Sequence, residues 1–209
     1  TVSPFIDCYC TPIPTQPADE DIYTVVMNGD STPAAYAGTN GCSTPAPGPG
    51  SILNRYSNFK TLAPLTTLGL NQSIPFSIDQ NECDGPTYYF NGIAIWIDYN
   101  HNGTFTDSGE QVFVETNTAQ GPRTVTGSFI VPSTAQTGIT AMRIICAEGY
   151  SGSSLTPCLN FSYGETEDYL VDIQCVAGTA TDVVTTCDSL VWIDGYTYTA
   201  NNSTATYTI

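Results

Sequence analysis

Short β-prone runs separated by turn residues are the feature that most limits how this 209-residue chain can fold. No stretch keeps apolar residues at the i, i+3, i+4 and i+7 spacing of an amphipathic helix. Val, Ile, Thr, Tyr and Phe gather instead in short runs between clusters of Gly, Pro, Asn and Asp, which is typical of strands and turns. The pattern predicts an all-β fold, an antiparallel β-sandwich of jelly-roll type.

Several runs have the composition of individual strands. Residues 73–78 predict a strand at a sheet edge, because Pro75 cannot donate a ladder hydrogen bond. A longer strand at about 88–97 leads straight into an acidic loop. Further strands are expected at 111–115, 124–131, 141–146 and 169–173, a loop at 43–50 (STPAPGPG), and an extended segment over residues 1–20.

The texture of the sequence changes from about Cys175. Runs at 190–193 and 196–199 flank Asp194-Gly195, which is a strong hairpin signal, and 203–209 predicts another strand. About 35 residues of β-structure are too few to close a core of their own. We therefore expect a β-sandwich domain over residues 1–174 and the start of a second, incomplete β-rich module over 175–209.

The charge balance excludes several classes of partner. The chain has 20 acidic and 4 basic side chains, for a net charge of −16. This charge repels nucleic acid and anionic membrane surfaces, and no apolar run is long enough for membrane insertion. An acidic, Lys-poor composition of this kind is typical of chains that recruit divalent cations, and also of chains that stay soluble at high ionic strength.

The cysteine usage favours an oxidising compartment. The eight cysteines form no C-x-x-C pair and are accompanied by a single histidine, so disulfides are favoured over zinc. Cys146 and Cys158 flank a Gly/Ser-rich loop and are expected to pair, while Cys187 is expected to lack its partner. The absence of a signal peptide suggests a mature segment whose targeting sequence has been removed. The cysteines are Cys8, Cys10, Cys42, Cys83, Cys146, Cys158, Cys175 and Cys187.

Residues 98–110, here called the acidic loop, have the front half of a calcium-binding pattern. Oxygen-bearing side chains occupy loop positions 1, 3 and 5, and Gly103 at position 6 permits a sharp turn. The last acid falls at position 13 instead of 12, and a strand precedes the loop where an EF-hand has a helix. The alternative is an Asx-rich turn held by hydrogen bonds without a metal. We expect one Ca²⁺ bound by Asp98, Asn100, Asn102, the Thr104 carbonyl, and Asp107 or Glu110.

Three segments together resemble a known family. They are residues 95–100 (IWIDYN) leading to Gly109-Glu110, residues 141–143 (AMR), and residues 163–169 (YGETEDY). With the opening at residues 9–12 (YCTP), they resemble the GEVED domain of secreted Bacteroidetes surface proteins over residues 9–174. The family name has Val where this chain has Thr166, a position we expect to face solvent.

The resemblance carries further expectations about pairing, export and role. It implies a Cys10–Cys42 disulfide, export to the extracellular cell surface by the type IX route, and a role in adhesion, surface filaments or enzyme targeting. The tail from Cys187 resembles the start of the Cys-Asp-Ser…Trp-Ile-Asp-Gly repeats of such proteins.

The acids of the 163–169 segment allow three interpretations. Glu165, Glu167 and Asp168 could form a solvated acidic turn, or one of them could complete the calcium shell. Alternatively, one could pair with Arg143, which lies among apolar residues and needs a partner when buried.

These observations favour a binding or structural module over an enzyme. Glu165 and Glu167 would lie about 7 Å apart on one strand face, which a glycosidase could use, but nothing marks a sugar cleft. We expect a non-catalytic extracellular calcium-binding module that mediates adhesion or surface assembly with neighbouring modules or surface-protein subunits. The alternative is a carbohydrate-binding module appended to a secreted hydrolase, with a glycan platform built from Tyr88, Tyr89, Tyr99, Tyr150 and Tyr163.

Overall fold

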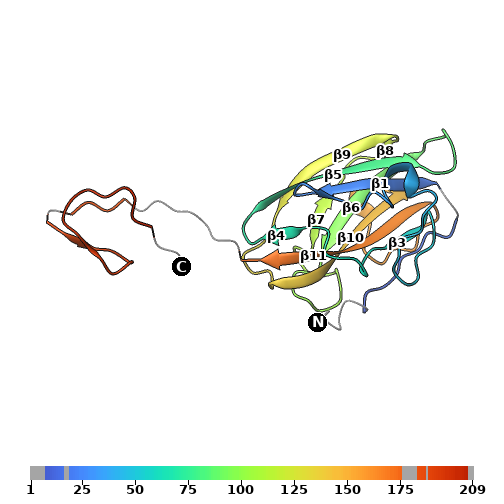
Figure 1. Cartoon of the computed structure of the whole chain (residues 1–209). Helices are drawn as coiled ribbons and strands as arrows, with labels where there is room; N and C mark the ends of the chain where they lie inside the picture. Colours follow the sequence, from blue (N-terminus) through green and yellow to red (C-terminus); the bar gives the residue numbers. More distant parts are fainter. Residues whose placement is uncertain (1–7, 17–18, 176–182, 187, 207–209) are drawn as a thin grey trace. The chain divides into compact units, whose positions relative to one another are not determined.

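The computed structural model describes residues 8–16, 19–175, 183–186 and 188–206 of the chain. It divides into two compact units, Thr1–Gln174 and Cys175–Ile209. The first unit contains two β-sheets that face each other, as Figure 1 shows. The predicted all-β sandwich is confirmed: the only helical turns among the described residues are the 3-10 helices η2 (Gly38–Asn40) and η3 (Gly152–Ser154).

The smaller sheet has four antiparallel strands in the order β2-β1-β5-β9. The larger sheet has the order β3-β11-β10-β6-β7, with β4 beside β11 and β8 beside β6; β3 and β4 run parallel to β11 and the other pairs are antiparallel. The strands of the smaller sheet are β1 (Glu20–Met27), β2 (Asp30–Ser31), β5 (Ser73–Glu82) and β9 (Arg123–Ile130). Those of the larger sheet are β3 (Tyr56–Asn58), β4 (Thr67–Gly69), β6 (Phe90–Ile97), β7 (Gln111–Val114), β8 (Ala119–Gln120), β10 (Gly138–Glu148) and β11 (Gly164–Gln174).

Side-chain alternation builds two apolar layers around the larger sheet. Ile93, Ile95 and Ile97 of β6 pack in the core between the two sheets. Ala94 and Trp96 point the other way and pack under loops on the outer face, with Tyr9 and other loop residues. Because both faces of the central strands are covered, β6 and β10 are buried almost throughout. The outer layer is completed by Phe105, Ala141, Ile145, Ala147, Leu155 and Phe161.

The strand over residues 73–78 is not at an edge, as the sequence predicted, because β5 lies between β1 and β9. The last β1–β5 pair is Met27 with Phe76, so Pro75 lies just past the end of β1. The Pro75 carbonyl accepts a hydrogen bond from Asn28 at 2.9 Å, and the N–H and C=O of a strand residue face the same neighbour. The missing N–H of Pro75 therefore faces the turn after β1 and removes no ladder bond.

Two disulfides are present in the described part of the chain, and neither predicted pair is correct. Cys10 bonds Cys158, and Cys42 bonds Cys83. Cys146 cannot reach Cys158 because alternation along β10 places its side chain between the sheets, whereas Arg143, on the opposite face, contacts Cys10 and Pro157. Disulfides are typical of proteins that mature in oxidising compartments. Within the described residues, no helix is long and apolar enough to span a bilayer.

The second unit contains the hairpin predicted at Asp194-Gly195. Strands β12 (Leu190–Val191) and β13 (Thr197–Tyr198) pair antiparallel, and Gly195 takes a φ of +83° in the turn. The strand predicted at 203–209 is not formed over residues 203–206, and its last three residues lie outside the described part, as does Cys187.

A candidate calcium loop and the buried acidic motif behind it

The acidic loop begins at Asp98, directly after β6, and this residue is fully buried. Its carboxylate accepts hydrogen bonds from the backbone N–H of Asn102 at 3.3 Å and of Gly103 at 2.9 Å. Its carbonyl accepts one from the Thr140 hydroxyl at 2.7 Å. Gly103 has a φ of +82°, which a residue with a side chain rarely adopts. Asp98 thus holds the first turn of the loop around its own carboxylate.

The next predicted ligands converge on Asp107 at the solvent-exposed side of the loop. Its Oδ2 accepts hydrogen bonds from the amides of Asn100 at 3.1 Å and Asn102 at 2.7 Å, and from the Thr104 hydroxyl at 3.4 Å. The Asn102 Oδ1 accepts from the Thr104 N–H at 2.9 Å. The bond from Asn102, followed by that from Asn100, lowers the pKa of Asp107 below its usual value.

Glu110, the last predicted ligand, closes the loop at its base. Its side chain accepts hydrogen bonds from the Tyr99 N–H at 3.2 Å and the Asp107 N–H at 3.1 Å. Burial, reinforced by the charges of Asp98 and Asp107, raises the pKa of Glu110 to about 7. The carboxylate is therefore costly to ionise in this arrangement, and a nearby cation would remove that cost.

The donor set of the loop suits a hard cation. The loop has three carboxylates and two side-chain amides, and each of these groups carries an oxygen atom. Oxygen atoms are the ligands that Ca²⁺ prefers. In the present geometry the amide N–H groups of Asn100 and Asn102 face Asp107. Metal binding requires these amides to turn their oxygens inward, which is a rotation about one side-chain bond. The same residues thus form the hydrogen-bonded Asx turn and carry the oxygen groups that a calcium loop would need.

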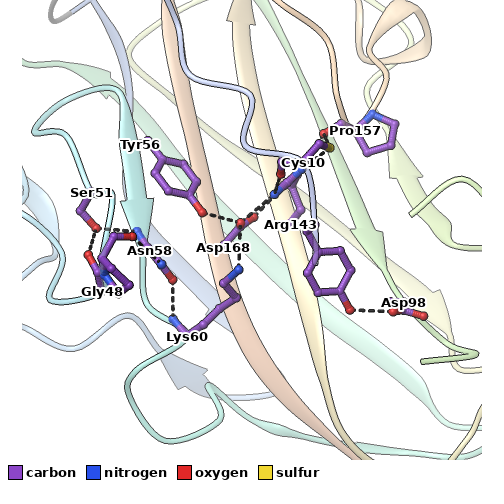
Figure 2. A network of polar contacts seen from close by, with 12 residues as sticks. Cys10, Gly48, Ser51, Tyr56, Asn58, Lys60, Asp98, Arg143, Pro157 and Asp168 are labelled. Carbon is purple, nitrogen blue, oxygen red and sulfur yellow. Dashed lines mark hydrogen bonds and ion pairs between the residues drawn. The ribbon is translucent and has the colours of Figure 1, made fainter. Parts of the chain in front are cut away.

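Behind the loop, Arg143 and Asp168 form a buried ion pair, drawn in Figure 2. Two bonds of 2.7 Å join the Arg143 guanidinium to the two carboxylate oxygens of Asp168. Asp168 also accepts a bond of 2.7 Å from the Tyr56 hydroxyl and lies 3.8 Å from the Lys60 ammonium. Burial alone would raise the pKa of Asp168, but the charges of Arg143 and Lys60 outweigh it and hold the pKa below its usual value.

The same guanidinium connects the ion pair to the first disulfide. Arg143 donates 2.7 Å bonds to the carbonyls of Cys10 and of Pro157, the residue before Cys158. Figure 2 shows Arg143 between Asp168 on one side and Cys10 and Pro157 on the other. Of the three interpretations of these acids, the pairing with Arg143 is therefore confirmed for one of them, Asp168.

Two aromatic rings carry this network to the acidic loop. The Phe105 ring, from the loop itself, lies 5.0 Å from the Arg143 guanidinium carbon and stacks on the Tyr9 ring at 4.4 Å between centroids. The Tyr9 hydroxyl donates a 2.6 Å bond to Asp98. The acidic loop and the 163–169 motif, 53 or more residues apart in sequence, are thus parts of one packed structure.

Glu165 and Glu167 do not form a solvated turn, because both are buried in β11. Glu165 accepts bonds from the Ile22 N–H at 2.9 Å and the Ser57 hydroxyl at 2.7 Å, and it shares a hydrogen bond with the Asp21 carboxyl. Burial raises the pKa of Glu167 well above its usual value, and its carboxyl accepts a 2.9 Å bond from the Tyr169 hydroxyl. Thr166 is also fully buried, which corrects the expectation that it faces solvent.

Several residues of this site were not predicted. Tyr56 and Asp21 lie outside the recognised motifs, and Tyr9 and Phe105 lie within the 9–12 opening and the acidic loop without an expected role. Only the fold brings these four residues to the acids. The tyrosine platform is not assembled as proposed, since Tyr99 is 6% exposed and packs in the core, whereas Tyr89 is 47% exposed.

Comparisons with known proteins bear on the first unit. A search of curated protein sequences gave no match. Among solved structures, the crystal structure of the CARDB domain of a Pyrococcus furiosus protein, in complex with di-metal ions, is similar at 11% identity and a TM-score of 0.33. That match covers 83% of this chain and 99% of the other. The chain is similar to the GEVED domain family over residues 92–172, which include most of β6, the acidic loop, β10 and the buried acids of β11.

Proposed function

We propose that the first unit is a non-catalytic, calcium-binding module of a secreted bacterial surface protein, of the kind found in Bacteroidetes, and that it acts in adhesion or surface assembly. The carrying observation is the convergence of Asp98, Asp107, Glu110, Asn100 and Asn102 on one loop. Among the described residues, the bonds that these carboxylates accept come from amides and hydroxyls, and not from Arg or Lys. The net charge of −16 adds to the affinity for a cation.

The packing of the loop indicates what calcium would do. Phe105 and Tyr9 connect the loop to Arg143 and Asp168 in the outer apolar layer. An ion that fixes the loop also fixes this layer, so calcium would stabilise the module and not perform chemistry. Two disulfides and the similarity to the GEVED family support an extracellular location.

Thermal unfolding tests the calcium proposal. Calcium bound only to the folded state raises the unfolding temperature by mass action. We expect millimolar Ca²⁺ to raise the Tm relative to EDTA, and we expect the amide NMR signals of Tyr99, Asn102 and Gly103 to shift on titration, since these N–H groups bond the candidate ligands.

Asp107→Asn is the informative variant because Asp107 lies at the exposed side of the loop and the change keeps the side-chain shape. It should weaken the calcium-induced shifts of the loop amides. Asp79→Asn, an exposed aspartate on β5, is the matched control and should leave them intact. Loop signals that do not respond to Ca²⁺ in the unmodified chain would refute the proposal.

The partner is proposed to be a neighbouring module of the same polypeptide or another surface-protein subunit. The second unit supports this, because Val191, Ile193 and Tyr196 of its hairpin are 68%, 58% and 70% exposed. Such apolar exposure on a small hairpin is typical of a contact surface. A glycan array screened with and without Ca²⁺ tests the competing role as a carbohydrate-binding module, and calcium-dependent glycan binding would favour that role instead.

A further inference from the structure

A second group of acids lies away from the acidic loop, where β1 begins and β5 ends. Asp19 and Glu20 lie at the start of β1, and Glu82 is the last residue of β5. One carboxylate oxygen from each of the three lies within 4.8 Å of the others. The three residues are 8%, 0% and 5% exposed, so the group is inside the protein and not on a solvated surface.

The two glutamates of this group lack the hydrogen bonds that the fold gives to Asp168 and Glu165. Both side-chain oxygens of Glu20 and both of Glu82 are buried and accept no hydrogen bond from the described residues. By contrast, Asp168 is bonded by Arg143 and Tyr56, and Glu165 by Ser57 and the Ile22 N–H. Burying a carboxylate without a hydrogen-bond partner costs folding free energy. A ligand bound to these four oxygens would remove that cost.

The surrounding charges increase this cost. Glu20 and Glu82 are directly opposite each other in the β1–β5 ladder, a position in which like charges are destabilising. Burial is the largest cause that raises the pKa of Asp19 to about 6 and those of Glu20 and Glu82 to about 7, and the charge of Glu148 acts in the same direction on all three carboxyls. The charges that act on all three are negative, and the group is complete only with protons or with a cation.

We propose that Asp19, Glu20 and Glu82 bind a divalent cation, and that this cation is Ca²⁺. An ion among three carboxylates satisfies the unpartnered oxygens and offsets the repulsion between the opposed glutamates. Ca²⁺–oxygen distances of about 2.3–2.6 Å let opposite ligands lie up to about 5 Å apart, so a group whose carboxylate oxygens all lie within 4.8 Å of one another can hold this ion. Mg²⁺ needs near-ideal octahedral geometry and keeps several of its waters, which suits a buried group of three carboxylates less well than the flexible coordination of Ca²⁺.

This site is separate from the acidic loop. Glu148, whose charge acts on all three carboxyls, pairs with Asn91 at the start of β6, and Asp98 follows the end of the same strand. Seven residues of strand at about 3.3 Å each place the two ends of β6 about 23 Å apart. The ion would join β1 to β5 beside the Cys42–Cys83 disulfide. Its function would be to hold the two strands together at this end of the sandwich.

Calorimetric titration of the full chain with Ca²⁺, after removal of metal by a chelator, tests the proposal. The unmodified chain should bind one ion at the acidic loop and one at the three-acid site. Glu20→Gln combined with Glu82→Gln should bind only the loop ion, and Asn102→Ala combined with Asp107→Ala should bind only the ion between β1 and β5. In the presence of chelator, the glutamine variant should unfold at a higher temperature than the unmodified chain. The reason is that two buried carboxylates no longer lie directly opposite each other.

The outcomes separate the two sites. If the glutamine variant still binds every ion that the unmodified chain binds, the three-acid site is refuted. If the only bound ion is lost in the glutamine variant and kept in the loop variant, the three-acid site stands and the calcium loop fails. Should the glutamine variant not fold, Asp19→Asn, just outside the strand pair, must weaken one of two binding events, or the proposal is wrong. A titration with Mg²⁺ that matches the Ca²⁺ result would refute the choice of metal.

Discussion

Arg143 and Asp168 illustrate how far a single residue could be interpreted before the fold was known. An arginine among Met142, Ile144 and Ile145 predicts a buried charge that needs an acid, and the structure confirms this. Which acid it takes depends on the register of β10 against β11, in which Arg143 is directly opposite Asp168. Register cannot be deduced from the composition of either strand, so three acids remained possible.

Thr166 offers a test of the same interior. The family name has Val at this position, and here the Thr166 hydroxyl is buried with no hydrogen-bond partner among the described residues. Thr166→Val replaces the hydroxyl by a methyl group of similar size and should raise the free energy of unfolding by about 1 kcal/mol. Urea denaturation measures the change.

Thr166→Ser is the matched control for this substitution. It keeps the hydroxyl and removes the methyl group, so it should lower the free energy of unfolding by about 1 kcal/mol. A Val variant less stable than the unmodified chain would show that the hydroxyl contributes a favourable interaction in the folded protein.

At the level of elements, the sequence predicted the apolar parts of the strands. It did not predict the strand segments that begin with polar or acidic residues. The strands expected at 88–97, 111–115 and 124–131 match β6, β7 and β9 within two residues at either end. Those expected at 141–146 and 169–173 cover only parts of β10 and β11, and β11 begins five residues earlier, at Gly164. β1 was missed because it opens with buried acids, which mask its alternation. The signal that could have found it is Asn28-Gly29, where φ angles of +52° and +92° form the tight turn into β2.

The disulfides show that cysteines close in sequence need not be close in the fold. Cys146 and Cys158 are near in sequence, yet the two faces of β10 keep them apart, whereas Cys10 and Cys158 meet from 148 residues away. Which cysteines pair depends on the strand face that each occupies and on its neighbours in space. Neither can be deduced from the sequence alone. The acids of the three-acid site were missed for the same reason, since Glu82 joins Asp19 and Glu20 only through the β1–β5 ladder.

The two disulfides should differ in what they contribute. In the chain-entropy account, closing a longer loop restricts the unfolded chain more. The separations are 148 residues for Cys10–Cys158 and 41 for Cys42–Cys83, which correspond to about 5 and about 4 kcal/mol as upper values. Cys10→Ala with Cys158→Ala should therefore destabilise more, by about 1 kcal/mol, than Cys42→Ala with Cys83→Ala.

Urea unfolding of the two double variants under identical conditions measures this difference. The first disulfide also lies against Arg143, whose guanidinium is 3.2 Å from the Cys10 sulfur, so the loss of local packing acts in the same direction. An equal or smaller cost for the Cys10–Cys158 pair would contradict both arguments.

For the whole molecule, the sequence predicted an all-β chain with a change of character near Cys175, and the structure has two compact units whose boundary in the sequence falls between Gln174 and Cys175. The first unit has a core between two sheets and a second apolar layer on its outer face. The described part of the second unit has a hairpin whose apolar side chains are largely exposed. A hairpin of this size is marginally stable alone and needs a surface to pack on. Neither the sequence nor the fold identifies that surface.

A chain that ends at Gln174 tests whether the first unit depends on the second. Since the core residues of both apolar layers lie within residues 9–173, we expect this shorter chain to unfold within about 2 °C of the full-length Tm, measured by calorimetry in saturating Ca²⁺.

In the full chain, a protease should cut residues 175–209 first and leave the sandwich intact, because Val191, Ile193 and Tyr196 are exposed. A fall of about 5 °C or more on truncation, which corresponds to more than about 1 kcal/mol for a domain of this size, would mean that the hairpin packs on the sandwich and is part of its stability. Protection of residues 175–209 together with an unchanged Tm of the shorter chain would instead mean that the second unit folds by itself, and the proposal that its exposed apolar side chains contact a neighbouring module or subunit would lose its support.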